Sequence, residues 1–486
     1  MENEGRKTTS LIIFGAGNYG IEALQRYGRK VVHYFCDNDT QKIGTLIRGV
    51  PVINFDKMIE IHKSGHPIMI CMEDYTAVVS QLEKNGVDDY LIYRRPGLPY
   101  ISFDSPETEE YTTNNKWLEE IEIQSKELDL LEDVNEYRKL SEKVLIECKD
   151  KNKYARYMYS YQQEYYYGNT EALFEYGNVH DDYKKFFPIV SHFDIIPWYS
   201  MQFYYNTATI VTGDYFKSAI QNRHAYLPVF CVGPYIHYAE SYYDADRIED
   251  KKKDIGRMML VFLPHTVEGN PATYDGHRFI DKVLSNYKNS YDSFWMCVYW
   301  TDINTEVCNY AESKGIKIVS AGIRTDRLFL SRLKSMMELA DSIVCGDAGT
   351  FLSYASYMGK PIALISIDEK DYSRMAITRF ESERKALFEF EDFIDFMNTF
   401  NELFDESPRL DNKQKAWLSK YSDSNKIRDG KYIRMVSEIS YDLWKESGWN
   451  VDEYPHAIHK TFRGYEIDRE FEKMSILQEA VGDLLI

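Results

Sequence analysis

The fold is decided most strongly by the stretch Ala340-Asp341-Ser342-Ile343-Val344-Cys345-Gly346-Asp347-Ala348-Gly349-Thr350, which continues to Gly359-Lys360-Pro361. Its apolar run predicts a buried strand, its glycines a loop, and Thr350 stands where it can cap the following helix. Gly359 suits the end of that helix, and Pro361 stops it. Backbone N–H groups at the start of such a helix favour a diphosphate, so Asp347, Gly349 and Thr350 are candidate ligand-binding residues.

Strand and helix patterns alternate on both sides of this stretch. Strict alternation predicts a parallel sheet that binds ligands at the carboxyl ends of its strands. The loop after the first strand carries His265, Thr266 and Glu268, and Arg324 follows the third. The predicted strands are 258–263, 294–300, 316–319, 342–345 and 362–365, and the predicted helices include 305–313 and 327–340.

Three further strands are predicted earlier in the chain, at 187–191, 208–212 and 228–232. Their ends present His192, Asp194, Asp214 and His237 toward one edge. Histidine and aspartate can take a proton from a hydroxyl group, so these are candidates for a general base. The alternative is that a histidine after a strand has a purely structural role.

The N-terminal segment opens with the apolar strand 11–14, followed by Gly15, Gly17 and Gly20 in G-x-G-x-x-G spacing. A helix and a second strand follow, and Asp37 stands at the tip of that strand. This arrangement is typical of a phosphate-binding turn. The glycines alternatively only shape a tight turn. NAD is a third option, but no later segment has the pattern of a hydride-transfer domain.

Residues 255–370 resemble the donor-binding lobe of GT-B-type glycosyltransferases, including teichoic-acid polymerases and capsule transferases, in the Ala-Asp, Gly-Thr and Gly-Lys-Pro series quoted above. The resemblance implies that Gly349 and Thr350 hold the donor phosphates and that Arg324 neutralises the leaving diphosphate. It also implies that the loop with His265, Thr266 and Glu268 contacts the donor. Three structural alternatives stay open: Thr350 as a helix cap only, Arg324 as the partner of a surface acid, and His265 as a loop residue whose side chain bonds the backbone.

In the same family a histidine at the end of the first acceptor-lobe strand acts as base, which here implies His192, with Asp194 orienting it or acting instead. The N-terminal segment resembles the βαβ domain of bacterial sugar acyltransferases, through Phe35-Cys36-Asp37-Asn38-Asp39 and Gly49-Val50-Pro51-Val52. Such domains bind a nucleotide sugar in some members and are structural in others.

Composition excludes several classes of function. The net charge of −19 argues against a nucleic-acid partner, because phosphate binding needs a basic field. Seven scattered cysteines without C-x-x-C spacing indicate a reducing compartment, with neither disulfides nor structural zinc. We expect a cytoplasmic protein, since no apolar stretch would span a bilayer. Peripheral contact with the inner face of the membrane and a homo-oligomer are left open.

The sequence therefore predicts an α/β chain, a small Rossmann-like domain joined to a GT-B-like two-lobed body with parallel sheets. The predicted function is transfer of a sugar from a nucleotide-activated donor to a bacterial surface polysaccharide or glycan, with no metal and no cofactor required. A phosphopolyol or phosphosugar transferase and a non-catalytic sugar-nucleotide-binding scaffold are the alternatives. The predicted units are 1–105 (Rossmann-like), 106–153 (helical linker), 154–254 (acceptor lobe), 255–386 (donor lobe) and 387–486 (C-terminal helices).

Overall fold

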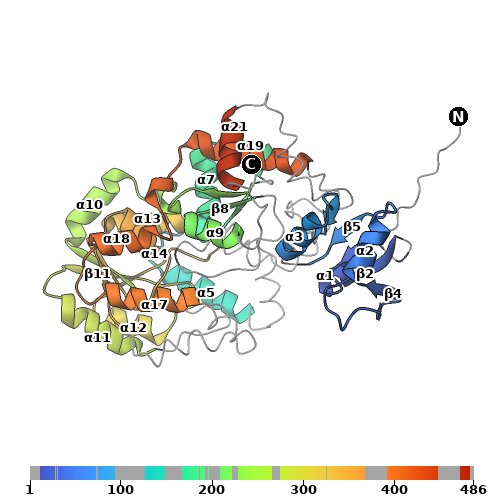
Figure 1. Cartoon of the computed structure of the whole chain (residues 1–486). Helices are drawn as coiled ribbons and strands as arrows, with labels where there is room; N and C mark the ends of the chain where they lie inside the picture. The colour runs from blue at the N-terminus through green and yellow to red at the C-terminus, as the bar shows by residue number, and fades with distance from the viewer. Residues whose placement is uncertain are drawn as a thin grey trace.

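In the part of the chain that the structure describes, three separate β-sheets form, and helices surround them (Figure 1). This confirms the predicted α/β class, with a small Rossmann-like unit followed by two parallel sheets. The GT-B-like two-lobed arrangement stays a prediction. The domain limits stay predictions. The computed structural model describes residues 11–27, 29, 31–72, 75–93, 125, 127–147, 167–184, 187–191, 195, 208–221, 228–264, 274–324, 326–366, 391–446 and 471–481.

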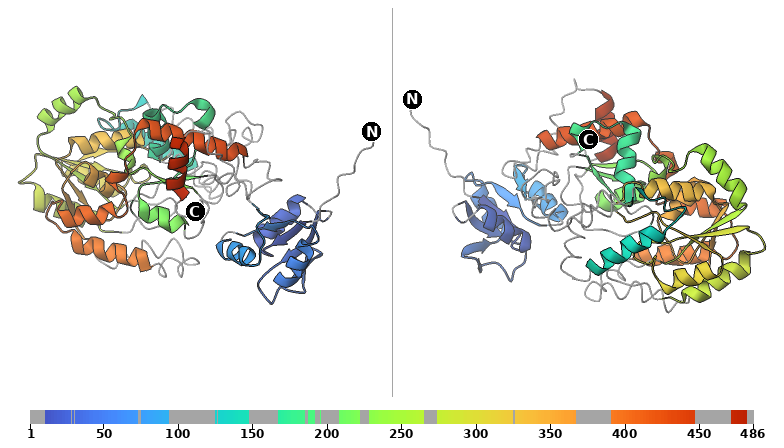
Figure 2. Two further views of the ribbon diagram at one scale, coloured as in Figure 1. Left: turned by 45° about the horizontal axis from the view of Figure 1, so that its top comes forward. Right: turned by 180° about the vertical axis from the view of Figure 1, so that it is seen from behind.

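The N-terminal sheet has six strands in the order β3-β4-β2-β1-β5-β6, and both views of Figure 2 show it to one side of the others. All its pairings are parallel except the β3–β4 hairpin, which the alternating pattern did not predict. Its strands are β1 Leu11–Phe14, β2 Val32–Cys36, β3 Leu46–Ile47, β4 Val50–Ile53, β5 Ile68–Ile70 and β6 Tyr90–Ile92, with helices α1 Asn18–Tyr27, α2 Phe55–His62 and α3 Thr76–Lys84.

The second sheet is parallel and has three short strands in the order β7-β8-β9. A 3₁₀ turn, η3, follows β9, and α10 then leads into the third sheet. The elements of this region are α7 Asn169–Gly177, α8 Asp181–Lys184, β7 Ile189–Val190, β8 Thr209–Val211, α9 Asp214–Gln221, β9 Val229–Cys231, η3 Tyr235–His237 and α10 Ala245–Ile255.

The third sheet has five parallel strands in the order β12-β11-β10-β13-β14. Helices cover both of its faces, so its strands are nearly continuous apolar runs rather than alternating ones. The polar exceptions are the first residues of β11, β12 and β13. Its elements are β10 Met258–Phe262, α11 Gly276–Tyr287, β11 Ser293–Cys297, α12 Glu306–Ser313, β12 Lys317–Val319, α13 Phe329–Leu339, β13 Ser342–Cys345, α14 Phe351–Tyr357 and β14 Ile362–Leu364.

The central strand β10 supplies side chains to the cores on both faces of this sheet. Met258, Leu260 and Phe262 join the core that contains α13 and α14, whereas Met259 and Val261 join the core that contains α11 and α12. Because successive strand residues point to opposite faces, a fully apolar strand is what this position requires.

Helix α5, Asn135–Glu147, belongs to the packing of the third sheet although the sequence predicts a linker there. Val134, Tyr137 and Leu140 are buried in the same core as α11 and α12. The hydroxyl of Ser141 also donates a hydrogen bond of 2.6 Å to the carbonyl of Trp300. This part of the predicted linker therefore packs into the core of the third sheet.

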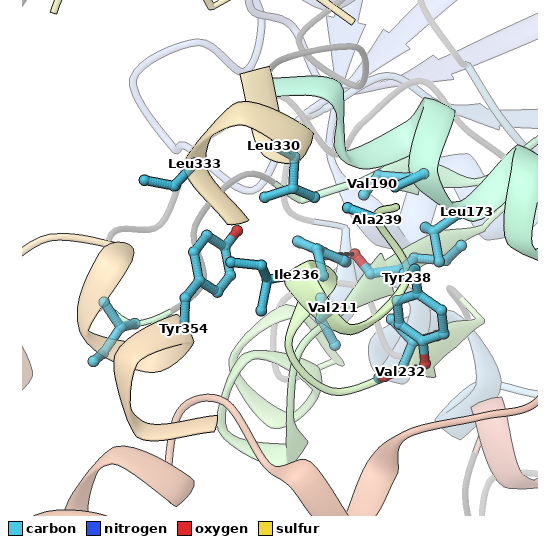
Figure 3. Packing of buried hydrophobic residues seen from close by; sticks show 14 of the residues in the cluster. Leu173, Val190, Val211, Val232, Ile236, Tyr238, Ala239, Leu330, Leu333 and Tyr354 are labelled. Atoms are coloured by element: carbon cyan, nitrogen blue, oxygen red, sulfur yellow. Dashed lines mark hydrogen bonds between the residues drawn. The ribbon is translucent and has the colours of Figure 1, made fainter. Parts of the chain in front are cut away.

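One continuous core joins the second and third sheets. Figure 3 shows Ile236 of η3 beside Tyr354 of α14 and Leu330 of α13, and Val211 and Val232 on its other side. The chain segment that connects the two sheets also lies beside α13, because the Nζ of Lys334 in that helix donates to the carbonyl of Ala239 at 2.6 Å. The two sheets of the body are thus held together by packing.

The C-terminal helices α19 and α21 lie beside the second sheet. Helix α19 packs on α7, and α21 packs on α19 and on β9 (Figure 1). Among the helices that the structure describes, none has both the length and the apolar character needed to cross a bilayer. These elements are α17 Glu391–Leu403, α18 Asn412–Ser419, η4 Ser424–Lys426, α19 Gly430–Glu446 and α21 Phe471–Val481.

Candidate functional site

The strand order of the third sheet defines a crevice at its carboxyl edge. From the central strand β10 the chain moves outward through β11 to β12, and then returns to the other side for β13 and β14. Loops after β10 and β13 therefore diverge, and ligands of open α/β sheets bind at such a topological switch point. The predicted donor residues other than Arg324 belong to the segments that follow these two strands. His265, Thr266 and Glu268, after β10, lie outside the described residues.

The loop after β13 carries the other predicted donor residues. The amide of Gly346 donates to the carbonyl of Phe262 at 3.1 Å, which fixes the loop to the end of β10. The side chain of Asp347 accepts from the amide of Ala348 at 2.6 Å. Within the part of the chain that the structure describes, the amides of Gly349 and Thr350 donate to no acceptor. Two N–H groups are thus available beside the crevice.

Thr350 stands at the N-cap position of α14, as predicted, but its side chain makes no capping hydrogen bond. Its backbone is already helical, with φ −57° and ψ −28°, whereas a capping side chain needs an extended residue. Its carbonyl accepts from the amide and hydroxyl of Ser353. The hydroxyl of Thr350 is therefore not used for capping.

Arg324 follows β12, which is separated from β13 by two other strands. At about 4.8 Å between neighbouring strands, the two strand ends lie about 14 Å apart. The side chain of Arg324 is only 6% exposed, and its carbonyl accepts from the amide of Tyr167 at 2.5 Å. One diphosphate would contact both Arg324 and Gly349 only if the arginine reached toward β10. Its role at the donor stays a prediction.

Asp326, two residues after Arg324, forms a fully buried ion pair with Arg332. Nη1 of Arg332 is 2.6 Å from Oδ2 of Asp326, and both side chains are 0% exposed. The hydroxyl of Ser125 donates to the same carboxylate at 2.9 Å, and Nη2 of Arg332 donates to the carbonyl of Ser125 at 2.7 Å. This network connects the loop after β12 to α13 and to the segment before α5.

Asp341 and Lys360, from the Ala-Asp and Gly-Lys-Pro parts of the predicted motif, make structural contacts that the sequence did not reveal. The carboxylate of Asp341 accepts from the amide of Met258 at 2.8 Å and so aligns the start of β13 with β10. The Nζ of Lys360 donates to the carbonyl of Ala340 at 2.7 Å, just after the end of α13. Cations at helix C-termini stabilise carbonyls that lack partners. These structural contacts explain both residues, so a ligand is not needed to account for either one.

In the second sheet, the predicted base His192 and its partner Asp194 lie outside the described residues. Asp214 is the first residue of α9, and Lys426 pairs with its carboxylate at 2.8 Å. Burial would raise the pKa of Asp214, but the hydrogen bond and charge of Lys426 outweigh it and lower the pKa below its usual value. Asp214 is therefore held as a carboxylate in a structural ion pair.

The C-terminal segment 421–428 covers the ends of β8 and β9. The hydroxyl of Thr212 donates to the carbonyl of Tyr421 at 3.1 Å, and the amide of Asp423 donates back to Thr212. A Cβ on Gly213 would lie 2.7 Å from the carbonyl oxygen of Tyr421, so only glycine fits there. The ends of β8 and β9 are therefore covered by this segment, whereas the end of β7 leads into His192.

His237 lies in η3, where the second sheet meets the third. Its Nδ1 is 2.7 Å from the hydroxyl of Tyr357 at the end of α14, and its Nε2 is 3.4 Å from the hydroxyl of Tyr176 in α7. Partial burial, followed by the nearby charge of Lys334, lowers the pKa of His237. The neutral imidazole thus bridges the two halves of the body.

We expect this histidine to make stability depend on pH. Because its pKa is lower in the folded than in the unfolded chain, the unfolded chain binds more protons just below pH 6.5. The contribution is full above that pH and is lost as the pH falls through the folded pKa. Urea unfolding of wild type and His237→Gln between pH 5 and 8 should show a steeper acid loss for the wild type. Parallel curves would contradict this.

In the N-terminal sheet, the glycine loop lies at a second switch point, between β1 and β5. Asp37 is engaged there: its Oδ2 accepts from the amide of Ala16 at 2.8 Å and from Lys42 at 3.1 Å. Partial burial would raise the pKa of Asp37, but these bonds and that from the Asp39 amide outweigh it and lower the pKa. The carboxylate predicted for a ligand therefore holds the loop itself.

The three glycines differ in what a side chain would meet. A Cβ would lie 2.4 Å from the carbonyl oxygen of Cys71 at Gly15, and 2.0 Å from the carbonyl oxygen of Gly15 at Gly20. At Gly17 nothing lies within 4 Å. Gly15 and Gly20 are thus explained by packing, and only the surroundings of Gly17 leave room for a ligand.

No protein-family model and no curated protein matches the chain. Solved structures that it resembles include S. aureus MnaA in a co-structure with UDP, at 12% identity and a TM-score of 0.29 over 92% of this chain and 99% of that one. UDP-GlcNAc 2-epimerase from Neisseria meningitidis bound to UDP-GlcNAc has 10% identity and a TM-score of 0.27 over 89% and 98%. Phytolacca americana UGT2 with UDP-2fluoro-glucose and pterostilbene has 9% identity and a TM-score of 0.22 over 94% and 99%.

Proposed function

We propose that this protein is a glycosyltransferase that moves a sugar from a nucleotide-activated donor to a bacterial surface polysaccharide or glycan. The observation that carries the proposal is the strand order of the third sheet. It brings the carboxyl ends of β10 and β13 to one switch point, and the loop after β13 holds Asp347, Gly349 and Thr350. The available amides of Gly349 and Thr350 suit the phosphates of such a donor.

In this proposal the donor diphosphate lies in the crevice and the acceptor approaches from the end of β7. An acceptor hydroxyl attacks the anomeric carbon, the bond from that carbon to the phosphate oxygen breaks, and the nucleoside diphosphate leaves. His192 takes the hydroxyl proton, oriented by Asp194. The amides of Gly349 and Thr350 stabilise the charge that develops on the leaving group, and this scheme requires no metal.

A thermal-shift screen tests the binding half of the proposal. The panel is UDP, GDP, CMP, CDP, dTDP and their sugars, with NAD and NADP alongside. A ligand at a hundred times its Kd should stabilise the chain by about 2.7 kcal/mol. Thr350→Glu places a carboxylate beside the phosphates and should abolish the shift, whereas Ser356→Glu, which adds the same charge at the far end of α14, should preserve it. A shift that survives Thr350→Glu would contradict this site.

Turnover distinguishes the enzyme from the scaffold alternative. In the enzyme, His192→Ala abolishes sugar transfer and leaves nucleotide binding intact, because the base acts on the acceptor and not on the donor. A wild type that binds a nucleotide sugar but transfers nothing to any glycan acceptor would favour the scaffold. Formation of a phosphodiester-linked product with release of a nucleoside monophosphate, in place of a glycoside and a nucleoside diphosphate, would favour the phosphopolyol transferase.

A further inference from the structure

Two phenylalanine rings lie face to face at the switch point of the third sheet. Phe262 is the last residue of β10, and Phe351 is the first residue of α14, which follows β13. Their centroids are 4.2 Å apart and their planes differ by only 3°. The ring pair therefore connects the end of β10 to the start of the helix that follows β13, at the crevice between these two strands.

The Phe351 ring is partly exposed and lies beside the backbone of the predicted phosphate-binding residues. Phe262, which is 8% exposed, covers one face of the ring. Gly349 lies against a ring edge, since a Cβ there would be 2.6 Å from Cε1 of Phe351. A ligand ring that stacks on Phe351 would therefore use the face opposite Phe262.

A planar ring is the group that extends such a parallel stack, and a base has a planar face whatever its identity. We propose that Phe351, supported by Phe262, is the platform on which the nucleobase of the donor stacks. The inference rests on the proposed function and deepens it. Because phenylalanine offers no hydrogen bond, this contact contributes affinity for the nucleotide without selecting among the bases.

Calorimetric titration with UDP and with inorganic pyrophosphate tests this role. Phe351→Leu keeps an apolar side chain but removes the aromatic face, so UDP affinity should fall about tenfold, within the range measured for base stacking. Phe351→Tyr keeps the face and should retain UDP affinity. Pyrophosphate has no base, so its affinity should be the same in wild type and both variants.

Phe329→Leu is the matched control. Phe329 is also the first residue of a helix at this sheet edge, but it follows β12 and contacts Tyr167 at 5.0 Å rather than a strand of the switch point. It should bind UDP like the wild type.

Three outcomes would overturn the inference. If Phe351→Leu weakens pyrophosphate as much as UDP, the ring only supports the loop. If UDP affinity is unchanged while that for UDP-glucose falls, the platform serves the sugar and not the base. If Phe351→Tyr loses as much UDP affinity as Phe351→Leu, the aromatic face is not the binding element. A wild type that binds neither probe would remove the proposed function together with this inference.

Discussion

Asp326→Ala is expected to lower the free energy of unfolding by about 3–5 kcal/mol, the usual cost of leaving one partner of a buried ion pair unpaired. Arg332 would keep its charge in the interior, because its side chain is 0% exposed. The hydroxyl of Ser125 would also lose its acceptor. Urea unfolding followed by circular dichroism measures the change.

Two controls separate charge burial from general damage at this position. Asp326→Leu combined with Arg332→Met removes both charges and should recover most of the lost stability, because buried pairs exchange for apolar groups with little net cost. Glu249→Ala breaks the exposed pair with Lys253 and should cost well under about 1 kcal/mol. A double variant as unstable as Asp326→Ala would show that geometry, and not the unpaired charge, sets the cost.

Gly20→Ala is expected to destabilise the N-terminal sheet by about 3 kcal/mol, at the upper end of overpacking costs. The new Cβ would lie 2.0 Å from the carbonyl oxygen of Gly15 and 2.9 Å from the ring of Phe35. The carbonyl belongs to the loop backbone, so relief requires the loop and α1 to separate.

Gly17→Ala is the matched control, since nothing lies within 4 Å of its Cβ, and we expect a change below about 0.5 kcal/mol. Residues 11–93 contain no tryptophan, so hydrogen exchange of the amides in β1 and β5, read by mass spectrometry, is the suitable measurement. Faster exchange should be confined to Gly20→Ala. If the amides of Gly20→Ala exchanged as slowly as those of Gly17→Ala and the wild type, the motif would tolerate side chains. Packing would then no longer explain its glycines.

The sequence by itself determined where several of the strands and helices lie, although not the β3–β4 hairpin. Strands β1 and β13 begin and end where the pattern predicts. These elements depend on local properties: an apolar run of strand length, a helical period, and glycine or proline at the ends. The same local reading found the loop after β13 and its Gly-Thr pair, and it gave the parallel arrangement because strands and helices alternate.

Only the tertiary structure decided which of the candidate residues meet. Asp37 and Asp214 stand at strand ends that suit a ligand, yet Ala16 and Lys42 engage the first and Lys426 engages the second. Phe351 directly follows the Gly-Thr pair in the sequence, but only the tertiary structure brings its ring against that of Phe262.

The order of the strands in each sheet was also beyond local reading. It sets the distance between Arg324 and Gly349, and it brings the end of β10 beside the start of the loop that carries Thr350. Strand order and burial depend on contacts between segments that are far apart in the chain, as between Ser125 and Arg332 or Thr212 and Tyr421. Such contacts form because apolar faces must be covered and buried polar groups must find partners, and neither requirement is written in the neighbouring residues.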